Sequence, residues 1–185
     1  MLVIGLVGKI GSGKDEVAKF LEEERDFLRI DMGDVSREIT REYGREMTRE
    51  NLQRSTKEYR AEHGKDALGK IVVKRIQKNG NERVVISAIR LPEDVMPLQA
   101  AFGTNVHVFE VTASAGVRFN RLKQRHTERD PQSRAAFEAQ EKSEEALFPS
   151  KALAPFIEQK IDNAGTHAKL FWQVDRILAK FENRV

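Results

Sequence analysis

The stretch that decides the fold is Gly8-Lys9-Ile10-Gly11-Ser12-Gly13-Lys14-Asp15. An apolar run, Leu2 to Val7, comes before it, and an amphipathic segment, Asp15 to Glu24, comes after it. Strand, glycine-rich loop and helix in this order predict a phosphate cradle. Glycines let several backbone N–H groups converge on one anion, and the helix N-terminus adds positive potential. Lys14 is placed to reach the β- and γ-phosphates of a nucleotide.

The context of this motif makes it more specific than its letters alone. The string G-x-x-x-x-G-K also arises by chance, and the alternative is a glycine-rich turn in an ordinary strand–helix unit. Here a predicted strand precedes the loop, a helix follows it, and the unit lies at the N-terminus, where the first strand of an α/β fold belongs. The sequence therefore predicts an ATP-binding loop formed by Gly8, Gly11, Ser12, Gly13, Lys14 and Asp15.

The composition restricts the class of protein. A chain of 185 residues suits one domain with small inserts. The sequence has no cysteine, which excludes disulfides and cysteine nucleophiles and fits a cytoplasmic protein. No run approaches the roughly 18 apolar residues of a membrane helix. With 32 basic and 29 acidic residues the surface is mixed, so a nucleic-acid partner is not expected, and we expect a monomer or a homodimer.

Alternating strands and helices predict a five-stranded parallel sheet in a three-layer α/β fold. We expect strands at residues 2–7, 27–30, 84–86, 106–111 and 160–162, and helices at 13–24, 35–43, 48–62, 65–78, 92–102, 114–125, 134–145 and from 166 onward. Residues 148–156 are expected to be irregular. About fifty residues of helix separate the second and third strands, which is more than a simple crossover needs. This segment therefore reads as an insert that covers a substrate.

Arginines and one acidic residue follow the predicted strand ends. Arg37 and Asp34 come after the second strand, and Arg90 comes after the third. Because ligands of open α/β sheets bind at the carboxyl ends of the strands, these residues are candidates for a ligand site. Arginine suits a phosphorylated ligand because its planar fork grips phosphate bidentately. For Asp34 two interpretations stay open: it directs Mg²⁺, or it only caps the helix that follows.

A second group of arginines lies on one predicted helix and in the polar segment after it. Arg118, Arg121 and Arg125 are spaced three and four residues apart and share one helix face, and Arg129 and Arg134 follow them. Phosphoryl transfer relies on cations that clamp the charge of the transferring group. An arginine on a helix face is also often a solvated surface charge, so for each of these side chains both interpretations stay open.

Three stretches of the chain resemble nucleoside-monophosphate-kinase-type P-loop proteins. They are Gly8–Asp15, the segment from Met32-Gly33-Asp34-Val35-Ser36-Arg37-Glu38 to Ala67, and Val84–Arg90 with Glu93. A weaker fourth stretch, Ile161–Gly165, accompanies the last helix. The chain looks in particular like archaeal kinases related to dephospho-CoA kinase or to adenylate kinase.

This resemblance implies ATP- and Mg²⁺-dependent phosphoryl transfer to a small phosphorylated acceptor, with a nucleoside monophosphate and dephospho-CoA both compatible. Together with the strand-end position of Asp34, it gives catalytic roles to Lys14, Asp34, Arg121 and Arg125 and metal binding to Asp34, whereas metal binding by Asp15 is a separate hypothesis. It places Arg37 and Arg90 on the acceptor, Arg129 in a lid, and Asn163 and Gly165 beside the donor adenine. It divides a single P-loop kinase domain into a core (1–31, 84–117 and 146–185), an acceptor-binding helical insert (about 32–83) and a short lid (about 118–145).

Two positions depart from the pattern of these kinases. They usually carry Asp-Gly at the end of the third strand, in V-V-I-D-G-x-R, where the Asp helps to hold Mg²⁺ through water, whereas this chain has Ser87-Ala88. After the loop lysine the motif expects Ser or Thr as a Mg²⁺ ligand, whereas this chain has Asp15. We hypothesise that Asp15 supplies the missing carboxylate. The alternative is a regulatory protein that binds nucleotide and has weak ATPase activity.

Overall fold

The structure of the chain is a computed structural model that describes residues 1–125 and 130–182. Five strands form one sheet in the order β2-β3-β1-β4-β5, and all neighbouring pairs are parallel. The strands are β1 (Leu2–Val7), β2 (Leu28–Asp31), β3 (Arg83–Ser87), β4 (Val106–Thr112) and β5 (Ile157–Asp162). The predicted five-stranded parallel sheet is confirmed.

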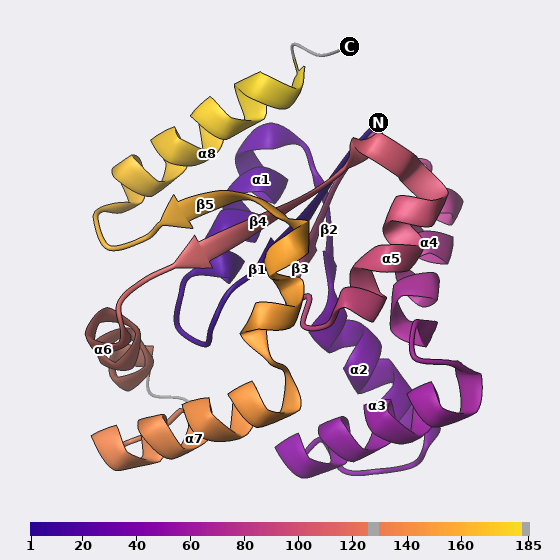
Figure 1. The fold of residues 1–185 in the computed structure, drawn as a ribbon, viewed down its shortest axis with the longest axis vertical. Coiled ribbons are helices and arrows are strands. Elements are labelled where there is room, and N and C mark those ends of the chain that lie inside the picture. The colour runs from indigo at the N-terminus through magenta and orange to yellow at the C-terminus, as the bar shows by residue number, and fades with distance from the viewer. Residues whose placement is uncertain (126–129, 183–185) are drawn as a thin grey trace.

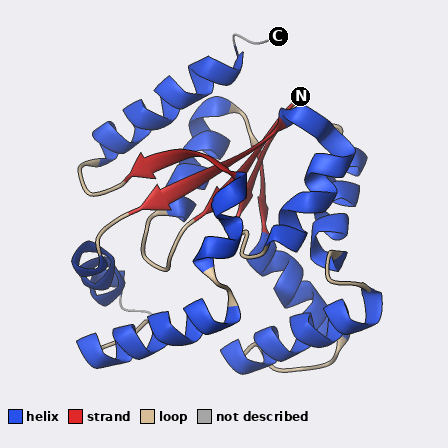
Figure 2. Ribbon diagram, in the orientation of Figure 1, coloured by secondary structure: helices blue, strands red, loops and turns tan. Residues whose placement is uncertain are grey.

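Helices cover both faces of the sheet and give three layers (Figure 1, Figure 2). One face carries α1 (Lys14–Arg25) and α8 (His167–Glu182), and the other carries α4 (Ala67–Asn79) and α5 (Pro92–Phe102). The remaining helices are α2 (Met32–Glu42), α3 (Arg49–His63), α6 (Ala115–Arg125), α7 (Arg134–Leu147) and the 3₁₀ helices η1 (Gly103–Asn105) and η2 (Ser150–Phe156). Within the described residues, no helix combines the length and apolar character needed to cross a membrane.

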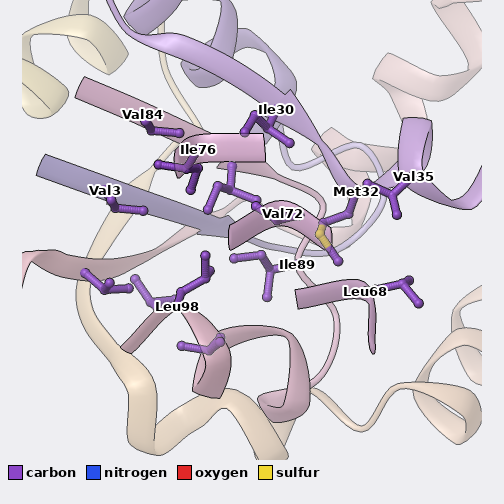
Figure 3. Close-up of a cluster of buried hydrophobic side chains, with 14 of the residues drawn as sticks. Val3, Ile30, Met32, Val35, Leu68, Val72, Ile76, Val84, Ile89 and Leu98 are labelled. Carbon is purple, nitrogen blue, oxygen red and sulfur yellow. The ribbon is translucent and has the colours of Figure 1, made fainter. Parts of the chain in front are cut away.

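Alternate residues of the strands fill the two faces. In β1, Val3 and Val7 belong to the apolar cluster under α4 and α5, whereas Ile4 and Leu6 belong to the one under α1 and α8. Parallel strands covered on both sides are expected to be apolar, as β1 and residues 84–86 of β3 are, whereas the edge strand β5 exposes Glu158, Lys160 and Asp162. Figure 3 shows the first cluster, in which the sheet packs on Leu68, Val72, Ile76 and Leu98. The sheet is thus a rigid support for the segments at its carboxyl edge.

The segments that follow the strands meet at this carboxyl edge. β1 runs into the glycine loop, β2 into α2, β3 into residues 88–91, β4 into α6, and β5 into Asn163. Beyond the edge, α3 of the insert and α7 approach each other (Figure 1), and an ion pair joins Arg49 of α3 to Glu144 of α7. Insert and α7 therefore enclose the region where the strands end.

Most boundaries differ from the sequence prediction by one or two residues, and three segments differ by more. α2 begins at Met32 rather than near residue 35, because Asp31 caps it by accepting the Gly33 N–H at 2.6 Å. β5 begins at Ile157 rather than at residue 160, because its pairing with β4 extends back to that residue. The segment 150–156, expected to be irregular, forms η2.

Candidate active site

The loop between β1 and α1 is a tight cradle with positions that only glycine fits. Gly13 precedes α1 with a φ of 90°, and a Cβ atom there would lie 2.0 Å from Nδ2 of Asn163. Gly11 has a φ of 75°, and a Cβ atom there would lie 2.9 Å from the carbonyl oxygen of Arg118. Contacts this short exclude side chains, so the loop keeps the bare backbone that a phosphate cradle needs.

A hydrogen-bond network holds this cradle against β5 and α6. Asn163 is 2% exposed and donates its Nδ2–H to the carbonyl of Ser12 at 2.8 Å. Its backbone N–H donates to the carbonyl of Thr112 at 2.8 Å. Arg121 donates to the carbonyl of Asn163 at 2.8 Å, to its Oδ1 at 3.2 Å, and to the carbonyl of Ser12 at 3.5 Å. The network fixes the shape of the loop before any ligand binds.

The positive charges of Lys14 and Arg121 are left for an anion. Lys14 is the first residue of α1, and the acceptors of Arg121 are neutral oxygens. In the part of the chain that the structure describes, neither side chain has a carboxylate within ion-pair distance. Asp15 is exposed in the first turn of α1, where a carboxylate also interacts favourably with the helix dipole.

Arg118 is 4% exposed, which excludes its interpretation as a solvated surface charge. It donates to the carbonyl of Ile10 in the loop at 3.3 Å and to the carbonyl of Ala113 before α6 at 3.0 Å. The same side chain donates to Oε1 of Glu141 in α7 at 2.5 Å. Arg118 therefore links the cradle, α6 and α7, which is a structural role.

Arg125, at the end of α6, is paired with buried Asp130. Its Nε donates to Oδ2 at 2.8 Å and its Nη2 to Oδ1 at 2.5 Å. The hydrogen bond to Asp130 raises the pKa of Arg125 above its ordinary value, and the negative charge of Asp15 adds to this effect. Asp15 and Arg125 are thus in electrostatic reach of each other. The predicted lid residue Arg129 lies outside the described residues.

A cavity of about 290 Å³ opens between the insert, the loop after β3 and α7. Its apolar lining includes Ile10, Met32, Leu52, Leu68 and Phe148, and its basic lining consists of Arg37, Arg49, Arg60, Arg90 and Arg125. Every one of these arginines has an acidic partner; the pairs are Arg37–Asp34, Arg49–Glu144, Arg60–Asp94, Arg90–Glu144 and Arg125–Asp130. The cavity thus gathers five arginines, side chains suited to phosphate, and each is paired with a carboxylate of the protein, with Glu144 serving both Arg49 and Arg90.

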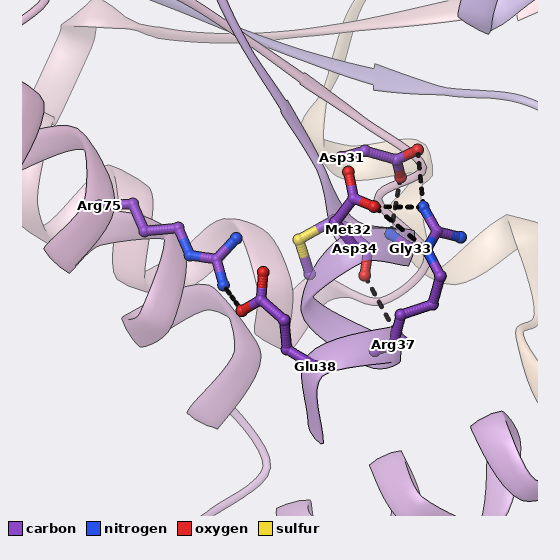
Figure 4. A network of polar contacts seen from close by, with 8 residues as sticks. Asp31, Met32, Gly33, Asp34, Arg37, Glu38 and Arg75 are labelled. Atoms are coloured by element: carbon purple, nitrogen blue, oxygen red, sulfur yellow. Dashed lines mark hydrogen bonds and ion pairs between the residues drawn. The ribbon is translucent and has the colours of Figure 1, made fainter. Parts of the chain in front are cut away.

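Arg37 lies between two carboxylates (Figure 4). Its Nη2 is 2.5 Å from Oδ1 of Asp34 and 3.8 Å from Oδ2 of Asp31, and its Nε donates to Oδ1 of Asp34 at 3.1 Å. The predicted acceptor-binding arginine therefore engages the predicted metal-binding aspartate. The interpretation of Asp34 as the cap of α2 is wrong, because Asp31 has that role. Figure 4 also shows Glu38 paired with Arg75, which ties α2 to α4.

The pair of Arg60 and Asp94 was not anticipated from the sequence. Asp94 is 2% exposed, and its Oδ1 accepts from Nη2 of Arg60 at 2.6 Å. Its Oδ2 accepts the backbone N–H of Leu91 at 3.1 Å and that of Arg90 at 3.4 Å. The pair therefore fixes the backbone of Arg90 against the insert. Pro92 with an acid two residues later is a helix-start signal that could have located Asp94, but nothing in the sequence named Arg60 as its partner.

A second cavity, of about 130 Å³, lies between the cradle and α7. Its lining includes Gly8 and Lys14 on one side, and the glutamates Glu110, Glu141, Glu144 and Glu145. The two cavities share the wall formed by Ile10, Ala88, Arg90, Glu144 and Phe148. The phosphate cradle and the arginine-lined cavity are therefore direct neighbours.

The end of β3 has a hydroxyl in place of a carboxylate. Ser87 is fully buried, and its Oγ has no hydrogen-bond partner among residues 1–125 and 130–182. Ala88 after it has a φ of 62°, a conformation that favours glycine. Over the same ranges, no three or more His, Cys, Asp or Glu side chains gather where they could hold a metal ion. Asp15 and Asp34 therefore do not form a complete protein cage.

Gly165 and the backbone of Asn163 lie in the turn between β5 and α8. Gly165 is exposed, and the Asn163 side chain points into the cradle network described above. The structure thus gives Asn163 a contact with the loop that the sequence did not suggest. The proximity of both residues to an adenine stays a prediction.

A glycine cradle after β1 and a lysine at the start of α1, in a five-stranded parallel sheet, define a P-loop protein with the kinase architecture. A family model described as an AAA domain matches residues 4–147. The chain belongs to this family, and it also belongs to the UPF0200 proteins. A UPF0200 protein of Thermococcus onnurineus (strain NA1) is 34% identical over 140 residues, which are 74% of this chain and 75% of the relative.

Solved structures agree on the fold. A gluconokinase from Sinorhizobium meliloti 1021 has a TM-score of 0.62 at 17% identity and covers 98% of this chain and 94% of its own. A shikimate kinase from Acinetobacter baumannii, in complex with shikimate, has a TM-score of 0.59 at 14% identity and covers 100% of this chain and 96% of its own. The resemblance to nucleoside-monophosphate-kinase-like P-loop proteins is thus supported at the level of family and fold.

Proposed function

We propose that this protein is a kinase that transfers a phosphoryl group from ATP, with Mg²⁺, to a small phosphorylated acceptor such as a nucleoside monophosphate. The observation that carries the proposal is the shared wall between the cavity beside Lys14 and the arginine-lined cavity. Because the two cavities adjoin at this shared lining, a donor phosphate in the cradle would lie next to an acceptor in the arginine-lined cavity. Phosphoryl transfer depends on such positioning of donor and acceptor oxygens.

The residues of the two cavities have different roles. The loop N–H groups and Lys14 hold the β- and γ-phosphates of the donor, and Arg121 adds positive charge at the cradle. Arg37 and Arg90 bind the acceptor, and Arg125 covers the transferring group. Catalysis then rests on position and charge, because phosphoryl transfer asks for little covalent chemistry from the protein.

The residues at the cradle fit a Mg²⁺ ion that is held mainly by phosphate and water oxygens. The P-loop kinase fold generally binds ATP with Mg²⁺, and such ions keep several waters and use one or two carboxylates. Asp15 next to Lys14 is one such carboxylate, and Asp34 would act through water once it leaves its pair with Arg37. When bound, the ion neutralises charge on the phosphates during transfer.

The volume of the acceptor cavity favours a compact acceptor. Its roughly 290 Å³ lies at the low end of the range of about 300–1,000 Å³ for small-molecule pockets. A nucleoside monophosphate fits this size better than dephospho-CoA, which would require the insert or α7 to move. Dephospho-CoA therefore belongs in the screen as the larger alternative.

A coupled ADP-release screen tests the proposal. The acceptors are nucleoside monophosphates, deoxynucleotides, dephospho-CoA and phosphomevalonate, each compared with no acceptor. We expect ADP formation that depends on one class of acceptor and falls at least about a hundredfold in Lys14→Ala. Lys19→Ala, an exposed lysine of α1, is the matched control and should keep full activity. Wild-type-like activity of Lys14→Ala would overturn the assignment.

The alternative is a nucleotide-binding regulatory protein with weak ATPase activity. Ser87 in place of a carboxylate at the end of β3 favours it, because a kinase of this type usually places a Mg²⁺-directing Asp there. This alternative predicts slow ADP formation that no acceptor accelerates. Cytoplasmic location, a monomeric or homodimeric state and the absence of a nucleic-acid partner stay predictions.

A further inference from the structure

Glu144, in the last turn of α7, is the one acidic side chain of the described chain that lines both cavities. It is 19% exposed. Its Oε1 accepts a hydrogen bond from Nη2 of Arg49 in α3, and the same oxygen lies 4.0 Å from Nη1 of Arg90. A single carboxylate oxygen therefore lies between guanidinium groups from two different segments.

The charges of this group do not balance. Arg49 and Arg90 contribute two positive charges, and over the described ranges Glu144 is the acidic partner of both. The pairs of Arg118 with Glu141 and of Arg60 with Asp94 each match one cation with one anion. A phosphate monoester carries up to two negative charges and three acceptor oxygens, so it would match two arginines better than one carboxylate does.

Two contacts hold Arg90 in a position where a phosphate could replace the Glu144 carboxylate. Its backbone N–H is fixed by Asp94, and its guanidinium lies over the ring of Phe148 with Cζ 4.9 Å from the ring centroid. Arg49 and Arg90 are both about half exposed. An anion that enters the cavity can therefore reach both side chains without unfolding the site.

We propose that Arg49 and Arg90 form the subsite for the phosphate of the acceptor, and that the Glu144 carboxylate occupies this subsite until the acceptor displaces it. The identity of the ligand as an acceptor rests on the proposed function. Arg49 is thus a further specificity-determining residue, and Glu144 is a positioning residue. The arrangement selects ligands with a dianionic group, because a weaker anion does not replace the carboxylate.

Displacement of Glu144 has a second consequence. Its carboxylate lines the cavity beside Lys14, where it would repel the phosphates of a bound donor. An acceptor that displaces this carboxylate from Arg49 and Arg90 also releases the contact between α7 and α3. Acceptor binding would therefore reduce the electrostatic repulsion of the donor phosphates, and Glu144 couples the two events.

Phosphate binding tests this subsite without any transfer reaction. The probe is inorganic phosphate, titrated at constant ionic strength into the full chain carrying Lys14→Ala, which weakens binding at the cradle. Phosphate affinity is obtained from the stabilisation against urea as a function of phosphate concentration. In this background, Arg49→Gln should weaken phosphate binding about tenfold, and Glu144→Gln should tighten it about tenfold, since each change removes or frees one charge-assisted contact.

Two matched controls lie on the same helices. Arg54→Gln on α3 and Glu138→Gln on α7 each break an exposed pair within one helix and should leave phosphate affinity unchanged. A purely structural pair of Arg49 and Glu144 predicts that both test variants lose stability with unchanged phosphate affinity, which would overturn the proposal. Lack of stabilisation by phosphate in both the parent and Glu144→Gln would overturn it as well. Failure of the kinase assignment would instead appear in the ADP screen and leave these affinities as they are.

Discussion

The cations at the glycine cradle and those of the arginine-lined cavity differ in their partners. Within the described ranges, Lys14 and Arg121 have no carboxylate at ion-pair distance, whereas all five arginines of the cavity are paired with Asp or Glu. An unpaired cation on a fixed loop can take an anion directly. A paired arginine must first give up its carboxylate. In the proposed kinase, the donor half (the cradle with Lys14 and Arg121) is therefore preorganised for phosphate, whereas in the acceptor half (the arginine-lined cavity) carboxylates of the protein already occupy the arginines.

This difference predicts that the cradle determines the affinity for the donor and that the arginine-lined cavity determines the selectivity for the acceptor. A preorganised cradle binds any triphosphate tail well, because little has to be rearranged. In the acceptor half every anion competes with a carboxylate of the protein, so only a ligand with more charge and better geometry gains by binding. The protein would thus accept its donor readily and choose its acceptor strictly.

The largest effect is expected on stability, when the ion pair of Arg60 and Asp94 in the acceptor half is removed. Arg60→Met leaves the carboxylate of Asp94 buried without its cation, so we expect a loss of about 3 kcal/mol in the free energy of unfolding. Nucleotide affinity at the cradle should be retained. Urea unfolding measures the first quantity and nucleotide titration the second.

Arg54→Met is the control for this change, since Arg54 forms an exposed pair on the same helix and should cost less than about 0.5 kcal/mol. A loss below about 1 kcal/mol for Arg60→Met would show that the backbone N–H groups of Leu91 and Arg90 already satisfy Asp94. A parallel loss of nucleotide affinity would show that the two halves are not separable.

The next largest effect is expected on nucleotide affinity, when a side chain is introduced into the glycine loop of the donor half. In Gly13→Ala the new Cβ would clash with Asn163 and require a φ of 90°, so we expect nucleotide affinity to fall by about 2 kcal/mol, or roughly thirtyfold. Gly44→Ala is the matched control: its φ is 64°, but nothing lies within 4 Å of the new Cβ. Equal nucleotide affinity in both variants would refute the idea of a preorganised cradle.

A smaller effect is expected from the positive charge of Arg121, which no carboxylate of the described residues pairs with. Arg121→Gln keeps a donor for the carbonyl oxygens but removes the unpaired positive charge, so we expect nucleotide affinity to fall about tenfold while phosphate binding at Arg49 and Arg90 stays constant. Lys123→Gln, an exposed residue of the same helix, controls for the change in net charge. If both variants lose the same affinity, the charge of Arg121 has no special place at the cradle.

The sequence was sufficient for the parts of this molecule that follow from local pattern. The loop motif, the apolar strands and the helical stripes predicted the parallel sheet and the order of its elements, because these signals lie within a few residues of each other. The order of helix and strand also placed Arg37 and Arg90 at the carboxyl edge. Asp31 could have been found as the cap of α2, since a capping acid two residues before a glycine N–H is a local feature.

The partners of the arginines could not be predicted, because they come from distant segments. Arg60 meets Asp94 from another helix, and Arg49 meets Glu144 across the cavity. Arg118 shows the same limit: its position on a helix face suggested a solvated charge or a lid residue, whereas packing of α6 buries it against the loop. Spacing fixes which face of a helix a residue occupies, and the tertiary fold decides what that face meets.

The smallest expected effect concerns Asp15 and the ion of the donor half. If Asp15 supplies the carboxylate that Ser87 lacks, Asp15→Ala should raise the Mg²⁺ concentration for half-maximal ADP formation by roughly two- to fivefold, because one carboxylate among phosphate and water ligands contributes only part of the binding. Glu16→Ala, the next exposed acid in the same turn, is the control. An unchanged Mg²⁺ titration for Asp15→Ala would refute the compensation between Asp15 and Ser87. The carboxylate in the first turn of α1 would then act on the helix dipole and on Arg125, and the donor half would handle its ion through the phosphates alone.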